Sequence, residues 1–233
     1  VQQFTMSLRR ELDFAAECRN AERIAGNFRG HDGIVIPRVH WQWTCESLNV
    51  QDFIQGIPGR DLAAVDAAGL DRAALARTGA GIVLKMVLDD GFFHADPHPG
   101  NIFYMRDGRI AVIDFGMVGR LSDQRRFQVA QLLYGLVSQD PELVTDVLLE
   151  WAGGIEVEEE RLQQDIGSFV DQYRGVPLKD LRMGLMLGDV TQILRQYGLT
   201  LPSDLALMIK TFLTLEGMGR QLDPDFDMAS EAR

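Results

Sequence analysis

The sequence predicts an α+β fold in which a small, partly stranded front part is followed by a larger, mostly helical part. β-forming residues gather in short clusters within residues 34–54 and 92–113. Apolar residues recur at helical spacing over residues 1–28 and over most of the chain after residue 122. With 233 residues, 46% of them hydrophobic, the chain is long enough for one domain of two lobes.

The first predicted element is a long amphipathic helix over residues 1–28. Its apolar positions repeat at helical spacing, and glycines at its end favour a stop. The polar face is acidic and includes Glu11, Asp13 and Glu17. Because Asp13 and Glu17 lie one turn apart, they are expected to share a face of the helix.

A two-stranded hairpin is predicted next, with strands at residues 34–43 and 47–54. Residues 56–59, Gly-Ile-Pro-Gly, are predicted to end it as a linker. We therefore expect a partial small lobe over residues 1–55, which holds the long helix and the hairpin. The large lobe is then expected to span residues 56–233.

The large lobe is predicted to be helical around a few short strands. Turn residues separate apolar segments that are too short for helices, and capping residues open the longer periodic ones. Short strands are expected at residues 92–93, 102–104 and 110–113. Helices are expected at residues 61–68, 71–90, 122–138, 141–151, 157–173, 178–197 and 202–220.

Composition narrows the class of function. Acidic residues outnumber basic ones by 34 to 23, so broad attraction to nucleic acid is not expected. The two isolated cysteines fit a reducing compartment, and we expect a cytoplasmic protein. No apolar run is long enough to cross a bilayer, and the start at Val1 leads us to expect a piece of a longer protein. Any membrane contact is expected to come from segments outside this chain.

The segment between the predicted short strands carries the chemistry. Asp96 precedes Asn101 by five positions, and Asp114 follows thirteen positions later and opens Asp-Phe-Gly. This spacing is typical of the catalytic loop and metal-binding aspartate of the kinase fold. It predicts a site for ATP and Mg²⁺ in which Asp96 is the catalytic carboxylate and Asn101 and Asp114 are metal ligands. Gly116 would let the backbone pass close to the phosphates, and His94 would brace the loop by hydrogen bonding.

A rival interpretation takes His94, Asp96 and His98 as ligands of a transition metal. Alternate residues of an extended segment share a face, and all three side chains can bind such metals. This interpretation gives no role to Asn101 or to the Asp-Phe-Gly segment. The kinase-like interpretation accounts for more of the pattern.

Three longer motifs resemble a known family. They are Glu11-Leu-Asp-Phe14 with Glu17 and Asn20, then Gly91-Phe-Phe-His-Ala-Asp-Pro-His-Pro-Gly-Asn101, and then Asp114-Phe-Gly-Met-Val-Gly-Arg-Leu121. Together with the closing Leu215-Glu-Gly-Met-Gly-Arg-Gln-Leu-Asp-Pro-Asp-Phe226, they are similar to the UbiB-type atypical kinases associated with ubiquinone biosynthesis. The match runs in order over nearly the whole chain.

The resemblance implies a protein-kinase-like fold that binds ATP and has atypical kinase or ATPase activity. It also implies a role in isoprenoid-quinone synthesis at the inner face of a membrane, with lipid or quinone-precursor molecules and quinone-biosynthesis proteins as partners. Glu17 would pair with a nucleotide-binding lysine, and Glu11 and Asp13 would face the site. Asp52 and Phe53 would lie at the adenine edge.

Two departures from ordinary protein kinases shape the expected activity. The three lysines, Lys85, Lys179 and Lys210, do not lie in a strand ahead of the acidic helix, so this chain alone is expected to be a poor or inactive enzyme. Little chain separates Gly116 from the next predicted helix, which favours a small or lipid-like acceptor over a protein. Two alternatives stay open, a non-enzymatic nucleotide-sensing scaffold and an aminoglycoside- or choline-type phosphotransferase.

Overall fold

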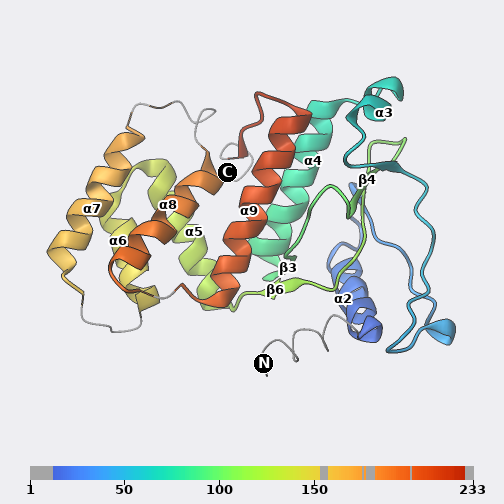
Figure 1. The fold of residues 1–233 in the computed structure, drawn as a ribbon, viewed down its shortest axis with the longest axis horizontal. Helices are drawn as coiled ribbons and strands as arrows, with labels where there is room; N and C mark the ends of the chain where they lie inside the picture. The colour runs from blue at the N-terminus through green and yellow to red at the C-terminus, as the bar shows by residue number, and fades with distance from the viewer. Residues whose placement is uncertain (1–12, 153–156, 175, 177–181, 200, 229–233) are drawn as a thin grey trace.

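A computed structural model describes residues 13–152, 157–174, 176, 182–199 and 201–228. It has the predicted α+β composition, with two small sheets and a majority of helix (Figure 1). In Figure 1, helices α5 to α8 gather on one side of the paired helices α4 and α9, and helix α2 and the larger sheet lie on the other. The α-helices are α2 (Phe14–Asn27), α3 (Leu62–Ala67), α4 (Arg72–Leu84), α5 (Asp123–Ser138), α6 (Pro141–Ala152), α7 (Glu159–Gln172), α8 (Met183–Gln196) and α9 (Ser203–Leu222).

Side-chain caps explain where several helices begin. Asp13, Asp61, Asp71 and Ser122 each accept a hydrogen bond from a backbone N–H in the first turn of α2, α3, α4 and α5. One regular helix was predicted as far as Asp90, but the regular part of α4 ends at Leu84. It passes into a π-helical turn, η2 (Lys85–Asp89), where Lys85 Nζ donates to Asp90 Oδ1 at 2.7 Å.

The larger sheet has four short strands in the order β1-β5-β4-β2. Its strands are β1 (Ile34–Val35), β2 (Ile57–Pro58), β4 (Ile102–Tyr104) and β5 (Ile110–Val112). Strand β1 pairs with β5 in parallel, whereas β4 pairs with both β5 and β2 in antiparallel fashion. The sheet therefore joins strands from both sides of residue 55, and the division into two lobes there stays a prediction.

A second sheet pairs β3 (Phe92–His94) with β6 (Val118–Arg120). Strand β6 was not predicted, because Val-Gly-Arg is too short to show a strand pattern. Its glycine is a packing requirement, since a side chain at Gly119 would collide with the ring of Phe93. Phe92, Phe93 and Phe115 are fully buried, so this pair of strands is part of the main core.

The predicted hairpin over residues 34–54 is wrong in detail. After β1, residues 36–54 form a short 3-10 helix, η1 (Trp41–Trp43), and two isolated antiparallel bridges, Val39 to Gln51 and Cys45 to Leu48. The Thr44 hydroxyl lies within hydrogen-bonding distance of the carbonyls of His40 and Val50 and accepts from Val50 N–H. These side-chain bonds compete with a regular ladder.

The segment predicted as a linker, residues 56–59, instead contributes strand β2. Ile57 and Pro58 pair with β4, and Gly59 N–H donates to the Ile102 carbonyl at 2.8 Å. Proline is tolerated because β2 is the edge strand of its sheet.

Candidate active site

Short strands bring the two halves of the predicted site together. In the β4–β5 pair, Ile102 lies opposite Val112, and the ladder continues as Ile113 N–H donates to the Asn101 carbonyl at 2.9 Å. Asn101 and Ile113, twelve positions apart in sequence, thereby become neighbours, and Asp114 follows directly. On the other side, β3 ends at His94 and leads into the loop that carries Asp96.

His94 ties these two halves to each other. Its Nδ1 accepts from the Asp96 backbone N–H at 3.1 Å, and its Nε2 lies 3.2 Å from the Ile113 carbonyl. The proton of the neutral ring therefore belongs on Nε2, where it can donate to that carbonyl. Burial lowers the pKa of His94 below its usual value, which keeps the ring neutral near pH 7.

Asp96 has a partly exposed carboxylate with two basic neighbours. Oδ1 accepts from Lys210 Nζ at 2.7 Å, and Oδ2 lies 3.7 Å from His98 Nε2. The hydrogen bond from Lys210 lowers the pKa of Asp96 below its ordinary value, with the lysine charge as a further cause. At neutral pH Asp96 is therefore an ionised acceptor, as a group that orients an attacking hydroxyl must be.

Asn101 and Asp114 offer oxygen atoms beside this loop. The buried Asn101 amide donates from Nδ2 to the Asp96 carbonyl at 3.3 Å, and its oxygen takes no part in that bond. Asp114 is exposed and adopts a left-handed backbone with φ of 61°, and its Oδ1 accepts from Gly116 N–H. A non-glycine residue in this conformation costs about 1–3 kcal/mol and is enriched at functional sites.

The oxygens of Asn101 and Asp114 fit Mg²⁺ better than a transition metal, because a hard cation prefers carboxylate and amide oxygens. The rival set of His94, Asp96 and His98 fits poorly. Both ring nitrogens of His94 have backbone partners, and His98 Nδ1 accepts from Gly100 N–H. Within the described residues, no three His, Cys, Asp or Glu side chains form a metal-binding group.

Helix α2 approaches the same place from the front part of the chain. Asn20 Nδ2 donates to the Phe115 carbonyl at 3.0 Å. Burial raises the pKa of the Glu17 carboxyl, the negative charge of Asp114 raises it further, and a backbone hydrogen bond with Phe115 opposes both. A cation near these two carboxylates would offset the repulsion between them.

The remaining predicted site residues lie apart from this group or outside the described residues. Glu11 is among the latter. Asp13 caps α2 through Ala16 N–H and lies 3.7 Å from Arg19. Asp52 pairs with His40 at 2.7 Å, and Phe53 is 90% exposed, so neither is enclosed in a pocket by the described residues.

Sequence reasoning missed one participant, Lys210. This residue lies on α9, 114 positions from the Asp96 carboxylate that it contacts. The only sequence signal was the rarity of lysine, since the chain contains three. A single lysine on an amphipathic helix normally indicates a solvated position, so its partner could not be identified without the helix packing.

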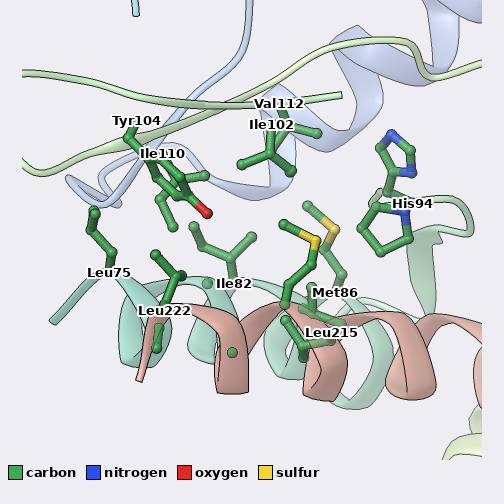
Figure 2. A pocket seen from close by; sticks show the side chains of 16 residues that line it. Leu75, Ile82, Met86, His94, Ile102, Tyr104, Ile110, Val112, Leu215 and Leu222 are labelled. Atoms are coloured by element: carbon green, nitrogen blue, oxygen red, sulfur yellow. The ribbon is translucent and has the colours of Figure 1, made fainter. Parts of the chain in front are cut away.

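An apolar cavity of about 50 Å³ adjoins the loop, between α4, α9 and the β4–β5 pair (Figure 2). By volume it could hold roughly three or four water-sized molecules. Its lining includes Leu75, Ile82, Tyr104 and Leu222, together with His94 and with Pro97 of the loop that carries Asp96. The ring of Tyr104 extends from β4 toward the cavity in Figure 2, and burial raises the pKa of its hydroxyl to about 12.

Comparison with protein families gives two matches. Residues 1–148 match the ABC1 atypical kinase-like domain, and residues 166–227 match the UbiB helical domain. The motif-based resemblance is thereby confirmed. None of the helices in the described part of the chain is both long and apolar enough to cross a bilayer.

Individual proteins agree with this assignment. Two uncharacterized proteins of Synechocystis sp., slr1919 and sll1770, are 32% and 31% identical over 100% and 96% of the chain. The chain spans only 41% and 38% of their lengths. A solved structure, the Rv3197–erythromycin complex from Mycobacterium tuberculosis, shares the fold. Its TM-score is 0.67 at 19% identity, over 96% of this chain and 57% of that one. The chain belongs to the ABC1 atypical kinase-like family, with a UbiB helical domain after the kinase-like part.

Proposed function

We propose that this chain carries most of an ATP- and Mg²⁺-dependent atypical kinase or ATPase site that supports ubiquinone or related isoprenoid-quinone biosynthesis. The observation that carries the proposal is the joining of Asp96, Asn101 and Asp114 through His94 and the β4–β5 pair. Family membership supports a phosphotransferase-type protein, and the site supplies the residues for the chemistry.

In this proposal the side-chain oxygens of Asn101 and Asp114 would hold magnesium, which neutralises charge on the ATP phosphates when bound. Asp96 orients the attacking hydroxyl or water and accepts its proton. A new O–P bond forms at the γ-phosphorus while the bond to the ADP oxygen breaks. Glu17 would pair with a nucleotide-binding lysine from outside this chain, and Asp52 and Phe53 would border the adenine.

A small or lipid-like molecule is favoured over a protein as the acceptor or regulator. Helix α5 begins at Asp123, seven positions after Gly116, which leaves little chain for a peptide-docking platform. The apolar cavity beside His94 and Pro97 suits a compact apolar group. Because isoprenoid quinones reside in bilayers, the protein would work peripherally at the cytoplasmic face of a membrane.

Phosphate release from ATP tests the catalytic part of the proposal. The assay uses a longer form of the protein, in which this chain is joined to a segment with the nucleotide-binding lysine that the proposal requires. Asp96→Ala is expected to abolish Mg²⁺-dependent release, and the matched control Asp107→Ala, in the exposed β4–β5 turn, is expected to leave it unchanged. Nucleotide binding without release in the unmutated protein would instead favour a nucleotide-sensing scaffold.

The cavity can be tested by filling it. A short prenyl alcohol is expected to change the rate of phosphate release in the unmutated protein. Ala76→Leu, which places extra methyl groups in the cavity, is expected to remove that response. Ala63→Leu, on the exposed face of α3, is the control and should retain it. If Ala76→Leu still responds to the prenyl alcohol, the cavity is not the place where this alcohol acts.

A further inference from the structure

Lys210 brings a positive charge from the C-terminal part of the chain to the catalytic loop. Its ammonium Nζ lies 2.7 Å from Asp96 Oδ1, and both side chains are partly exposed, at 50% for Lys210 and 31% for Asp96. An exposed pair of this kind adds little to stability in general. The position of this pair, on the carboxylate that the kinase-like site uses, calls for a different role.

The packing of α9 fixes where Lys210 stands. The next residue, Thr211, is fully buried, and its hydroxyl donates to the Leu207 carbonyl and lies 3.5 Å from the His94 carbonyl. Met208 and Phe212 on the same helix are buried in the core. Since the backbone on both sides of Lys210 is anchored, its side chain is held near the loop.

The two oxygens of Asp96 have different neighbours. Lys210 holds Oδ1, and the ring of His98 faces Oδ2 at 3.7 Å. During phosphoryl transfer this carboxylate stands next to a negatively charged phosphoryl group, and the two repel each other unless a cation lies near. A lysine ammonium provides such a charge, as a compact cation with three donors.

We propose that Lys210 is a positioning residue for phosphoryl transfer: it holds the Asp96 carboxylate toward the acceptor and offsets the repulsion between that carboxylate and the transferring phosphoryl group. The inference rests on the proposed function. It gives the helical region a direct part in the chemistry, because a shift of α9 would move the cation that orients Asp96.

Steady-state ATP hydrolysis by the longer form of the protein that carries the nucleotide-binding lysine tests this role. Lys210→Met is expected to lower kcat about 10- to 100-fold, because a misplaced catalytic group costs this much. Nucleotide affinity should stay within about threefold, because Lys210 acts on the chemical step. Lys210→Arg, which keeps the charge, should retain kcat within about fivefold. An unchanged or increased kcat in Lys210→Met would overturn the proposal, as would an equal loss in Lys210→Arg.

Two further variants separate positioning from a general effect on folding. Lys85→Met breaks another lysine–aspartate pair of the same 2.7 Å length, away from Asp96, and should leave kcat per folded molecule unchanged. Asp96→Asn, which keeps a polar side chain, is expected to leave a small residual rate of ATP hydrolysis, and adding Lys210→Met should not lower that residual rate, since Lys210 acts through Asp96. An additional loss in the double variant would contradict the inference.

Acetylation of lysines tests the pair without any turnover. Mass spectrometry resolves the sites, because the chain contains three lysines. Asp96→Asn should raise the rate of Lys210 acetylation about threefold or more, since the ammonium loses a charged partner, and should leave Lys85 unchanged. Equal Lys210 rates in both proteins would overturn the pair itself. If Asp96→Asn raises the rate of Lys210 acetylation but the unmutated protein does not hydrolyse ATP, the contact is confirmed and the proposed function is contradicted.

Discussion

The loop region, residues 91–121, and the extended segment, residues 36–55, are both rich in β-forming residues, yet they fold differently. In the loop region two antiparallel strand pairs surround the candidate site, and Phe92, Phe93 and Phe115 are fully buried. The extended segment has isolated bridges, and Trp43 and Phe53 are exposed. β-propensity produces a strand only where a partner strand and a core are available.

The largest expected difference between the two regions is in stability. Phe93→Ala removes a fully buried ring and is expected to lower the free energy of unfolding by about 3–5 kcal/mol. Phe53→Ala makes the same chemical change at a side chain that is 90% exposed and should stay within about 0.5 kcal/mol. Urea denaturation followed by circular dichroism measures both. Similar losses in the two variants would mean that Phe53 is covered in solution.

Two glycines with positive φ, one at the start of the loop region and one ahead of the extended segment, should differ less in the stability cost of an alanine substitution. Gly91, at the start of the loop region, has φ of 58°, and an added Cβ would lie 2.6 Å from the Leu121 carbonyl oxygen. Gly91→Ala should therefore cost more than about 2 kcal/mol. Gly30, ahead of the extended segment, has φ of 84° and open space around its Cα. Gly30→Ala should cost only about 1–2 kcal/mol. Equal costs in denaturation would show that the loop region can relax around the new methyl group.

Removal of the Glu17 charge is expected to have the smallest effect on stability, and to raise stability where the preceding substitutions lower it. Because burial raises the pKa of its carboxyl in the folded state, the contribution of Glu17 to stability is fully present below the ordinary pKa of 4.5. That contribution is lost as the pH rises through the raised value. Glu17→Gln should therefore raise Tm at pH 7 and make little difference below about pH 4.

Glu160→Gln is the control for this prediction, since Glu160 is exposed on α7 and should show no such pH-dependent gain. The Tm values of both variants and of the unmutated protein, measured by thermal unfolding at both pH values, test this prediction. A lower Tm for Glu17→Gln at pH 7 would mean that a cation already compensates the Glu17 charge in this chain.

Local pattern was sufficient for much of the fold. Capping residues open helices as predicted, among them Asp71 and Ser122, and the strands predicted at residues 102–104 and 110–113 are present and pair with each other. The short β4–β5 connection also explains why Asn101 and Ile113 are neighbours, since a tight turn fixes the register of a hairpin. These features depend on residues close in sequence.

Features that depend on distant packing were not predictable. The parallel pairing of β1 with β5 joins residues far apart in sequence, and two-residue strands leave no period to detect. The contact between Lys210 and Asp96 depends on how α9 docks beside β3 and the loop. In both cases the deciding information is the tertiary arrangement, which residue spacing does not contain.

Nucleotide-dependent stabilisation tests the central claim most directly, because a ligand that binds only the folded state raises Tm by mass action. ATP should stabilise the longer form of the protein, which carries the nucleotide-binding lysine, with Mg²⁺ and much less with a chelator. Asp114→Asn should lose the Mg²⁺-dependent part, and Asp107→Asn, on the exposed β4–β5 turn, should keep it. Equal Mg²⁺-dependent stabilisation of the unmutated protein and Asp114→Asn would contradict the assignment of this loop as a nucleotide and metal site.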